Sequence, residues 1–164
     1  MKRMVTALVL ACSLMAPSAY AQMGGMAPSS SMPQRDPTAP YQAGVAAFNA
    51  GNYAEAIRQL REARRARPND GTINYALGIA YNANGDKEEA KTALERAVRA
   101  PNAPIPARLQ LGLVALSLGD RDTATAQQTA LQQSIASCSG SCGDAQRTQM
   151  QAALDQLTRA LATP

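Results

Sequence analysis

The sequence predicts an all-α protein built as a solenoid of stacked helical hairpins. Small residues recur three times at a spacing of 34, in two glycine series and one alanine series: Gly44, Gly78 and Gly112; Gly51, Gly85 and Gly119; Ala56, Ala90 and Ala124. A period of this length is typical of helix–turn–helix units that bury their apolar faces against one another. The composition agrees, because Ala and Gln are abundant while aromatic residues make up only 4% of the chain.

Residues 1–21 carry the pattern of a secretory signal peptide. A short basic start precedes an apolar run, and Ala19-Tyr20-Ala21 supplies the small-x-small site after which cleavage would leave Gln22 first. The apolar run is shorter than the roughly 20 residues that a membrane-spanning helix needs. We therefore expect export to the bacterial periplasm without stable membrane insertion, with full secretion as an alternative. A lipoprotein signal ending at Cys12 is a second interpretation of the same segment.

Residues 22–40 predict a flexible linker, because Met, Ser, Pro and Gly dominate and no apolar periodicity is present. Met23, Met26 and Met32 allow a second interpretation, since thioether ligands suit Cu(I). The chain contains no His to reinforce such a site.

Three hairpins are expected over residues 41–137, with unit bounds near 37–70, 71–104 and 105–137. In each unit a glycine can take positive φ to end the first helix, and an Asn or Asp follows as N-cap of the second. These capping residues are Asn52, Asp86 and Asp120. Pro68 and Pro101 stop the second helices of the first two units.

The third unit departs from the pattern in its second helix. Gln128 occupies the position of a large apolar residue, and Leu131 replaces a small one. Residues 138–164 are expected to form a cysteine-bridged turn and a last helix over Asp144 to Ala162. Its apolar stripe would consist of Met150, Leu154, Leu157 and Leu161, so we expect it to cap the solenoid.

Cys138 and Cys142 are the cysteines that remain after signal cleavage. An even count in an exported protein predicts a disulfide, which would fix the turn before the capping helix. A redox-active pair and a metal site are the alternatives.

Arg58, Arg61 and Arg65 lie at i, i+3 and i+7 and form a basic stripe, in a chain of net charge +4. Such a stripe could contact an anionic partner or could be a solvated helix face. No aromatic residues interleave with it, so binding of single-stranded nucleic acid is not expected.

The anchor residues resemble the tetratricopeptide repeat (TPR) family over residues 37–136. The middle unit reads Leu77-Gly78-Ile79-Ala80-Tyr81, then Gly85-Asp86, then Ala90, Leu94 and Ala97, and the first unit repeats much of it as Ala43-Gly44, Gly51-Asn52-Tyr53, Ala56, Leu60 and Ala63. The resemblance implies a right-handed solenoid that binds a protein or peptide partner, here in the cell envelope, in a concave groove. The chain lacks His, a nucleophile paired with a base and a phosphate-binding glycine loop, so neither catalysis nor a cofactor is expected.

Carried over position by position, the resemblance also implies which residues line the groove. These are Tyr41, Val45, Phe48 and Asn49 in the first unit, Tyr75, Ile79 and Asn82 in the second, and Leu109, Leu113 and Leu116 in the third. The set lacks the Lys/Arg and Asn arrangement by which some family members hold a C-terminal carboxylate. An amphipathic helix or an extended apolar peptide is the expected ligand. The alternative function is periplasmic metal binding or delivery through the Met-rich linker or the cysteine pair.

Overall fold

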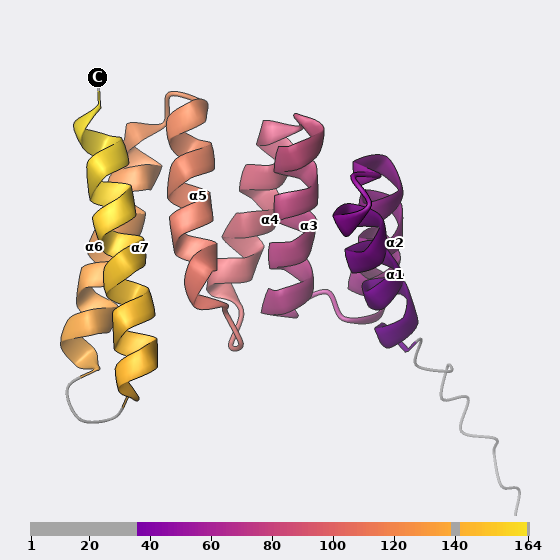
Figure 1. The fold of residues 1–164 in the computed structure, drawn as a ribbon, viewed down its shortest axis with the longest axis horizontal. Helices are drawn as coiled ribbons and strands as arrows, with labels where there is room; N and C mark the ends of the chain where they lie inside the picture. Colours follow the sequence, from indigo (N-terminus) through magenta and orange to yellow (C-terminus); the bar gives the residue numbers. More distant parts are fainter. Residues whose placement is uncertain (1–35, 139–141, 164) are drawn as a thin grey trace, which may run out of the picture. The chain divides into compact units, whose positions relative to one another are not determined.

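The computed structural model describes residues 36–138 and 142–163. These ranges contain seven α-helices and no strand, as Figure 1 shows. The predicted all-α helical repeat fold is therefore confirmed. The predicted signal peptide, most of the linker and its three methionines, and residues 139–141 of the cysteine turn lie outside the described residues.

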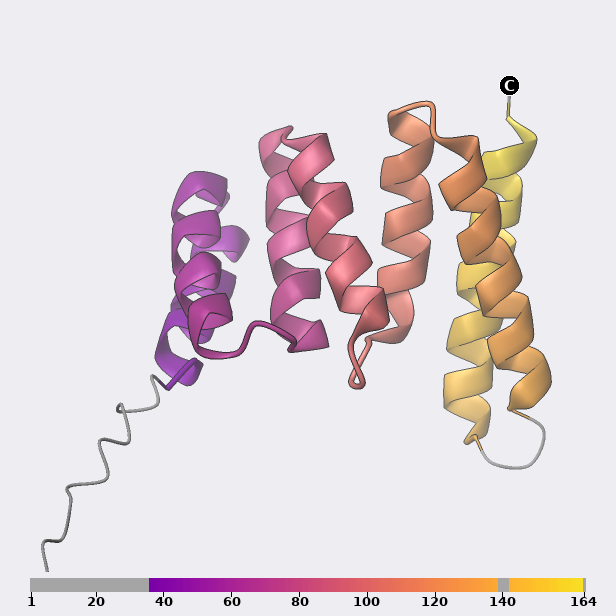
Figure 2. The ribbon, with the colours of Figure 1, turned by 180° about the vertical axis from the view of Figure 1, so that it is seen from behind.

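The helices follow one another as hairpins. Their bounds are α1 Thr38–Asn49, α2 Tyr53–Ala66, α3 Gly71–Asn84, α4 Lys87–Arg99, α5 Ile105–Ser117, α6 Arg121–Ser137 and α7 Asp144–Ala162. Figures 1 and 2 show the members of each pair side by side, with α3 between the first hairpin and α4. The last helix, α7, packs against both α5 and α6.

Glycines in the left-handed region end the first helix of every hairpin. Gly51, Gly85 and Gly119 have φ values of 75°, 94° and 77°. A side chain is strained at such angles, so glycine is the residue that the turn needs. The second helix of each hairpin begins two residues after this glycine, directly after the predicted N-cap residue.

Two of the three predicted N-caps form side-chain hydrogen bonds. Asn52 accepts from the Glu55 N–H, and Asp120 accepts from the Thr123 N–H at 2.9 Å. Asp86 instead directs its carboxylate to the Asn84 amide, whose Nδ2 donates at 2.8 Å. Asp86 is the N-cap residue of α4, as expected, but its side chain makes no capping hydrogen bond, because the neighbouring amide takes one of its oxygens.

In each of the first two hairpins, the two helices approach closely at the glycine and alanine that recur every 34 residues. A Cβ added at Gly78 would lie 2.6 Å from Leu94 Cγ, and a Cβ at Gly44 would lie 2.6 Å from Leu60 Cγ. Ala90 is fully buried beside the Gly78–Leu94 contact. Small residues at these positions allow the leucines to fill the space between the helices.

A buried amide holds the connection between the first and second units. Asn74 Nδ2 donates to the carbonyls of Pro68 and Asp70 at 2.8 and 2.7 Å. Asn102 Oδ1 accepts from the Gly71 N–H at 2.7 Å and ties this corner to the end of the second unit. These bonds satisfy backbone groups that the turn leaves outside any helix.

An ion pair joins the second and third units. Lys91 of α4 pairs with Asp120 at the start of α6. The Lys91 ammonium, with the Thr123 backbone and hydroxyl, holds the pKa of the Asp120 carboxyl well below its usual range. Asp120 thus serves the α6 terminus and the contact between units at once.

The last helix supplies the apolar residue that the third unit lacks. A Cβ added at Gly112 would lie 2.6 Å from Leu157 Cδ1, so a leucine of α7 covers the glycine that α6 does not cover. Gln128 Nε2 donates to Thr158 Oγ1 of α7 at 2.8 Å. Leu131 is buried, and it packs with Leu157. The departure from the repeat pattern is therefore compensated by α7, which acts as the predicted cap.

Candidate functional site

The candidate face begins on α1, where the predicted residues are unevenly exposed. Tyr41 and Phe48 are half-buried and pack against the first core cluster. The Phe48 and Tyr53 ring centroids lie 5.4 Å apart, which fixes the Phe48 ring. Val45 is half-buried, whereas Asn49 is exposed at the helix end.

The middle of the face is formed by α3. Tyr75, Ile79 and Asn82 are each half-buried. Tyr75 packs against a cluster that includes Leu94 and Leu111. Its burial raises the pKa of the phenol, so the hydroxyl stays neutral and available as a hydrogen-bond donor at physiological pH.

A pocket of about 220 Å³ joins α1 to α3. Its walls come from the start of α1, from the α2–α3 connection and from the start of α3: Pro37, Thr38, Tyr41, Gln42, Arg67, Asp70, Thr72 and Ile73. Thr38 and Thr72 are separated by the same 34 residues as the glycine series. That spacing could have added both threonines to the predicted site, but Arg67 and Asp70 come from a turn that the repeat pattern leaves unspecified.

The third-unit candidates lie against α7. Leu109 is only 8% exposed and belongs to a core cluster with Leu131 and Leu157. Leu113 and Leu116 pack against the same cluster. Leu109 is therefore not open to a ligand in this structure, whereas Leu113 and Leu116 are half-buried, as Tyr75 and Ile79 of α3 are.

The basic stripe on α2 is largely solvated. Arg58 pairs with Glu55 through an Nη2–Oε1 distance of 2.6 Å, and Arg65 pairs with Glu62. The Arg58 and Arg65 side chains are 72% and 61% exposed. Because carboxylates on the same helix already pair with two of its three arginines, the stripe has the features of a hydrated helix face.

The cysteines lie at the corner between α6 and α7. The Cα atoms of Cys138 and Cys142 are 5.3 Å apart, within the range of protein disulfides, and the structure places their sulfur atoms as a bonded pair. Cys138 is 2% exposed, and Arg147 Nη2 donates to its carbonyl at 3.1 Å. Over residues 36–138 and 142–163, no group of three or more His, Cys, Asp or Glu side chains is arranged to hold a metal ion.

In the same ranges, none of the helices is both long and apolar enough to span a bilayer.

Comparisons with known proteins agree with this architecture. A sequence profile described as tetratricopeptide repeat matches residues 41–104, from α1 to just beyond α4. The TPR repeat-containing protein PA4299 of Pseudomonas aeruginosa is 37% identical over 92 residues, which cover 54% of this chain and 36% of that protein. Cellulose synthase operon protein C of Escherichia coli (strain K12) is 42% identical over 55 residues, or 34% of this chain and 5% of that protein. The chain thus spans about a third or less of the length of these curated relatives.

Two solved structures share the fold. The Sgt2 TPR domain from Aspergillus fumigatus superposes with a TM-score of 0.59 at 22% identity, covering 77% of this chain and 80% of that domain. MamA gives a TM-score of 0.54 at 20% identity, covering 76% of this chain and 78% of that structure.

The fold is that of a helical-repeat scaffold for protein–protein interaction, in which neighbouring hairpins present side chains on a shared face. Residues 41–104 thus match the tetratricopeptide repeat family, and the described helices around them share its fold.

Proposed function

We propose that the protein is an exported, non-catalytic scaffold that binds a protein or peptide partner on the face formed by α1 and α3. The observation that carries this proposal is the row of half-buried aromatic and aliphatic side chains on these two helices, represented by Tyr41, Tyr75 and Ile79. Side chains of this kind lose little conformational entropy on binding and often supply most of an interface's binding energy. An amphipathic helix or an extended apolar peptide is the ligand that fits them.

The bacterial periplasm is the proposed location. The support comes from the signal-peptide pattern of residues 1–21 and from the paired placement of Cys138 and Cys142, which suits an oxidising compartment. One matched relative is named for the cellulose synthase operon. From this relative we propose for the chain only a location in the cell envelope.

Partner capture should depend on α3. We expect Tyr75→Ala and Ile79→Ala each to weaken capture of an envelope partner by about tenfold, as removal of an interface anchor does. The measurement is crosslinking pull-down from an envelope extract with the purified mature protein, followed by titration of the captured partner.

The control for capture is charge reversal on the opposite helix, Arg58→Glu with Arg61→Glu, which should leave affinity unchanged. Circular dichroism checks that each variant is folded, since Tyr75 also packs against the core. Full affinity in both α3 variants, together with loss of binding on charge reversal, would place the interface on the α2 face and contradict the proposal.

Export predicts a defined mature N-terminus. Mass spectrometry of protein from the periplasmic fraction should find cleavage after Ala21 and a chain that starts at Gln22, because the small-x-small site precedes it. An acylated chain starting at Cys12 would instead make the protein a membrane-tethered lipoprotein.

The cysteine pair is proposed to be a structural disulfide. Thiol labelling of the unreduced, denatured mature protein should give almost no signal. Double replacement by Ser should lower the melting temperature modestly, since the loop is short and the stabilisation falls below the roughly 3 kcal/mol of a 15-residue loop. Partner capture should be retained. Lost capture at unchanged stability would indicate a redox or metal role.

Metal binding remains the alternative function. It depends on Met23, Met26 and Met32, which lie outside the described residues, or on Cys138 and Cys142 as free thiols. Metal analysis of the mature protein, purified with its linker, tests it directly.

A further inference from the structure

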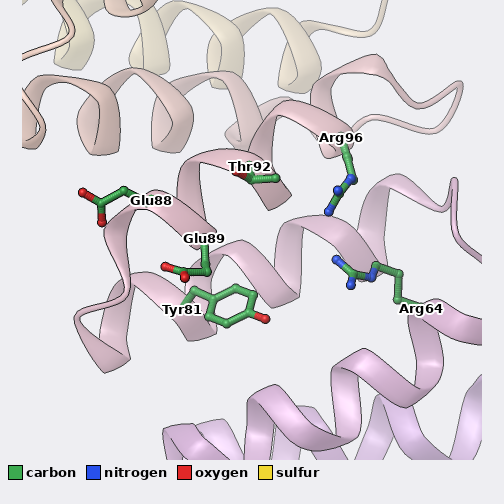
Figure 3. Close-up of a pocket in the computed structure, with 6 residues that line it drawn as sticks. All are labelled: Arg64, Tyr81, Glu88, Glu89, Thr92 and Arg96. Carbon is green, nitrogen blue, oxygen red and sulfur yellow. The ribbon is translucent and has the colours of Figure 1, made fainter.

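A second pocket, separate from the candidate face, lies where the first two units meet on the α2–α4 side. It has a volume of about 240 Å³ and is lined by residues of three helices: Arg64 of α2, Tyr81 of α3, and Glu88, Glu89, Thr92 and Arg96 of α4. Figure 3 shows the acidic side chains at one end of the pocket and the two arginines at the other. The pocket exists only when the two units are stacked.

The arginine end of the pocket contains two like charges that face each other. The guanidinium groups of Arg64 and Arg96 point toward one another in Figure 3. Burial, followed by repulsion from Arg96, lowers the pKa of Arg64. Arg64 is half-buried and Arg96 is exposed. Two cations held close together disfavour the charged state of each other unless an anion lies between them.

Among the described residues, several arginines of the same two helices are paired with a carboxylate, whereas Arg64 and Arg96, like Arg61, are not. Arg58 and Arg65 of α2 and Arg99 of α4 each pair with a glutamate. Among the residues that the structure describes, no carboxylate lies within ion-pair distance of Arg64 or Arg96. Glu88 and Glu89 line the same pocket but lie at its far end.

We propose that the Arg64–Arg96 end of this pocket binds a phosphate-type oxyanion. Two guanidinium groups provide two charges and two planar sets of donors, which match the charge and the several acceptor oxygens of a phosphate dianion. Tyr81 and Thr92 line the same pocket, and each carries a hydroxyl that can serve as a further hydrogen-bond donor. The acidic end disfavours a second anion there, so the rest of a larger ligand is neutral or cationic.

The site is independent of the proposed partner face on α1 and α3. A failure of phosphate binding would not contradict the proposed partner face. Loss of partner capture would not contradict the phosphate site. Free phosphate and the phosphate group of a larger compound share the chemistry that the two arginines recognise.

The test is a titration of the mature protein with inorganic phosphate against sodium chloride at equal ionic strength. Isothermal calorimetry should show saturable binding to phosphate only. Arg64→Gln and Arg96→Gln should each weaken it by at least about tenfold, the value of one charge-assisted hydrogen bond. Arg99→Gln is the matched control, since Arg99 is on the same helix and already pairs with Glu95; it should bind phosphate as the unmodified protein does.

Amide resonances of the unmodified protein provide a readout that does not depend on any variant folding. Those of Thr92 and Arg96 should shift saturably with phosphate and stay in place with chloride. Equal weakening by all three substitutions, or unmoved resonances in phosphate, overturns the proposal. A second titration with O-phosphoethanolamine distinguishes the ligand sources. Tighter binding than that of phosphate supports a larger ligand whose cationic part contacts Glu88 and Glu89. Equal binding supports phosphate alone.

Discussion

Leu157→Ala should lower the free energy of unfolding by about 2–5 kcal/mol, the usual cost of truncating a fully buried leucine. Leu157 is 0% exposed and packs on Gly112 and on the Leu109–Leu131 cluster. Because the third unit carries Gln128 where the other units carry a leucine, no side chain of α6 is placed to fill the space that the substitution opens. Urea denaturation followed by circular dichroism measures the change.

Leu161→Ala is the matched control for this experiment. Leu161 lies one turn further along α7 and is only half-buried against the same cluster, so its truncation should cost clearly less. If Leu161→Ala were as destabilising as Leu157→Ala, or if both were neutral, α7 would not be seated on Gly112 as described. A destabilised Leu157→Ala protein should also expose Leu113 and Leu116, which increased binding of an apolar dye would detect.

Features that repeat along the chain could be predicted from the sequence, because each is decided within one hairpin. A glycine with positive φ, an N-cap next to it and a buried alanine in the following helix need only local spacing, so Gly85, Ala90 and Leu94 were placed correctly. The same logic explains the loss of pattern at Gln128. The repeat pattern showed that the third unit lacks a large apolar side chain at position 128, but it did not show that Leu157 of α7 takes that place.

The remaining features depend on contacts between elements that do not share the period. Leu157 lies outside the repeats, and its approach to Gly112 follows from how α7 folds back onto α5 and α6. Leu109 was predicted to line the groove, but it is buried in a cluster with Leu157 of α7, which the repeat pattern does not include. Arg64 and Arg96 belong to different helices of different units, so their proximity is a product of stacking. In sequence, Arg64 is merely a neighbour of the basic stripe.

Gly78→Val should be the most disruptive single change in the second unit, costing about 3 kcal/mol or more, the upper end of the range for overpacked cores. The first added carbon would lie 2.6 Å from Leu94 Cγ and 3.3 Å from the Ala90 carbonyl oxygen. Leu94 is 0% exposed and has no free space to move into, and the Ala90 oxygen is held by the α4 backbone. Thermal and urea unfolding of the purified variant measure the effect.

Two matched substitutions separate overpacking from the general cost of a β-branched residue in a helix. Ala83→Val places the same side chain on the exposed side of α3 and should cost less than about 1 kcal/mol. Gly112→Val should fall between the two, because the atoms nearest its added carbon all belong to the Leu157 side chain, which can shift more readily than a helix backbone. The expected order of destabilisation is therefore Gly78→Val, then Gly112→Val, then Ala83→Val. If Gly78→Val were tolerated as well as Ala83→Val, α3 and α4 could not be packed as closely as the Gly78–Leu94 contact requires, and the small-residue explanation of the 34-residue period would fail with it.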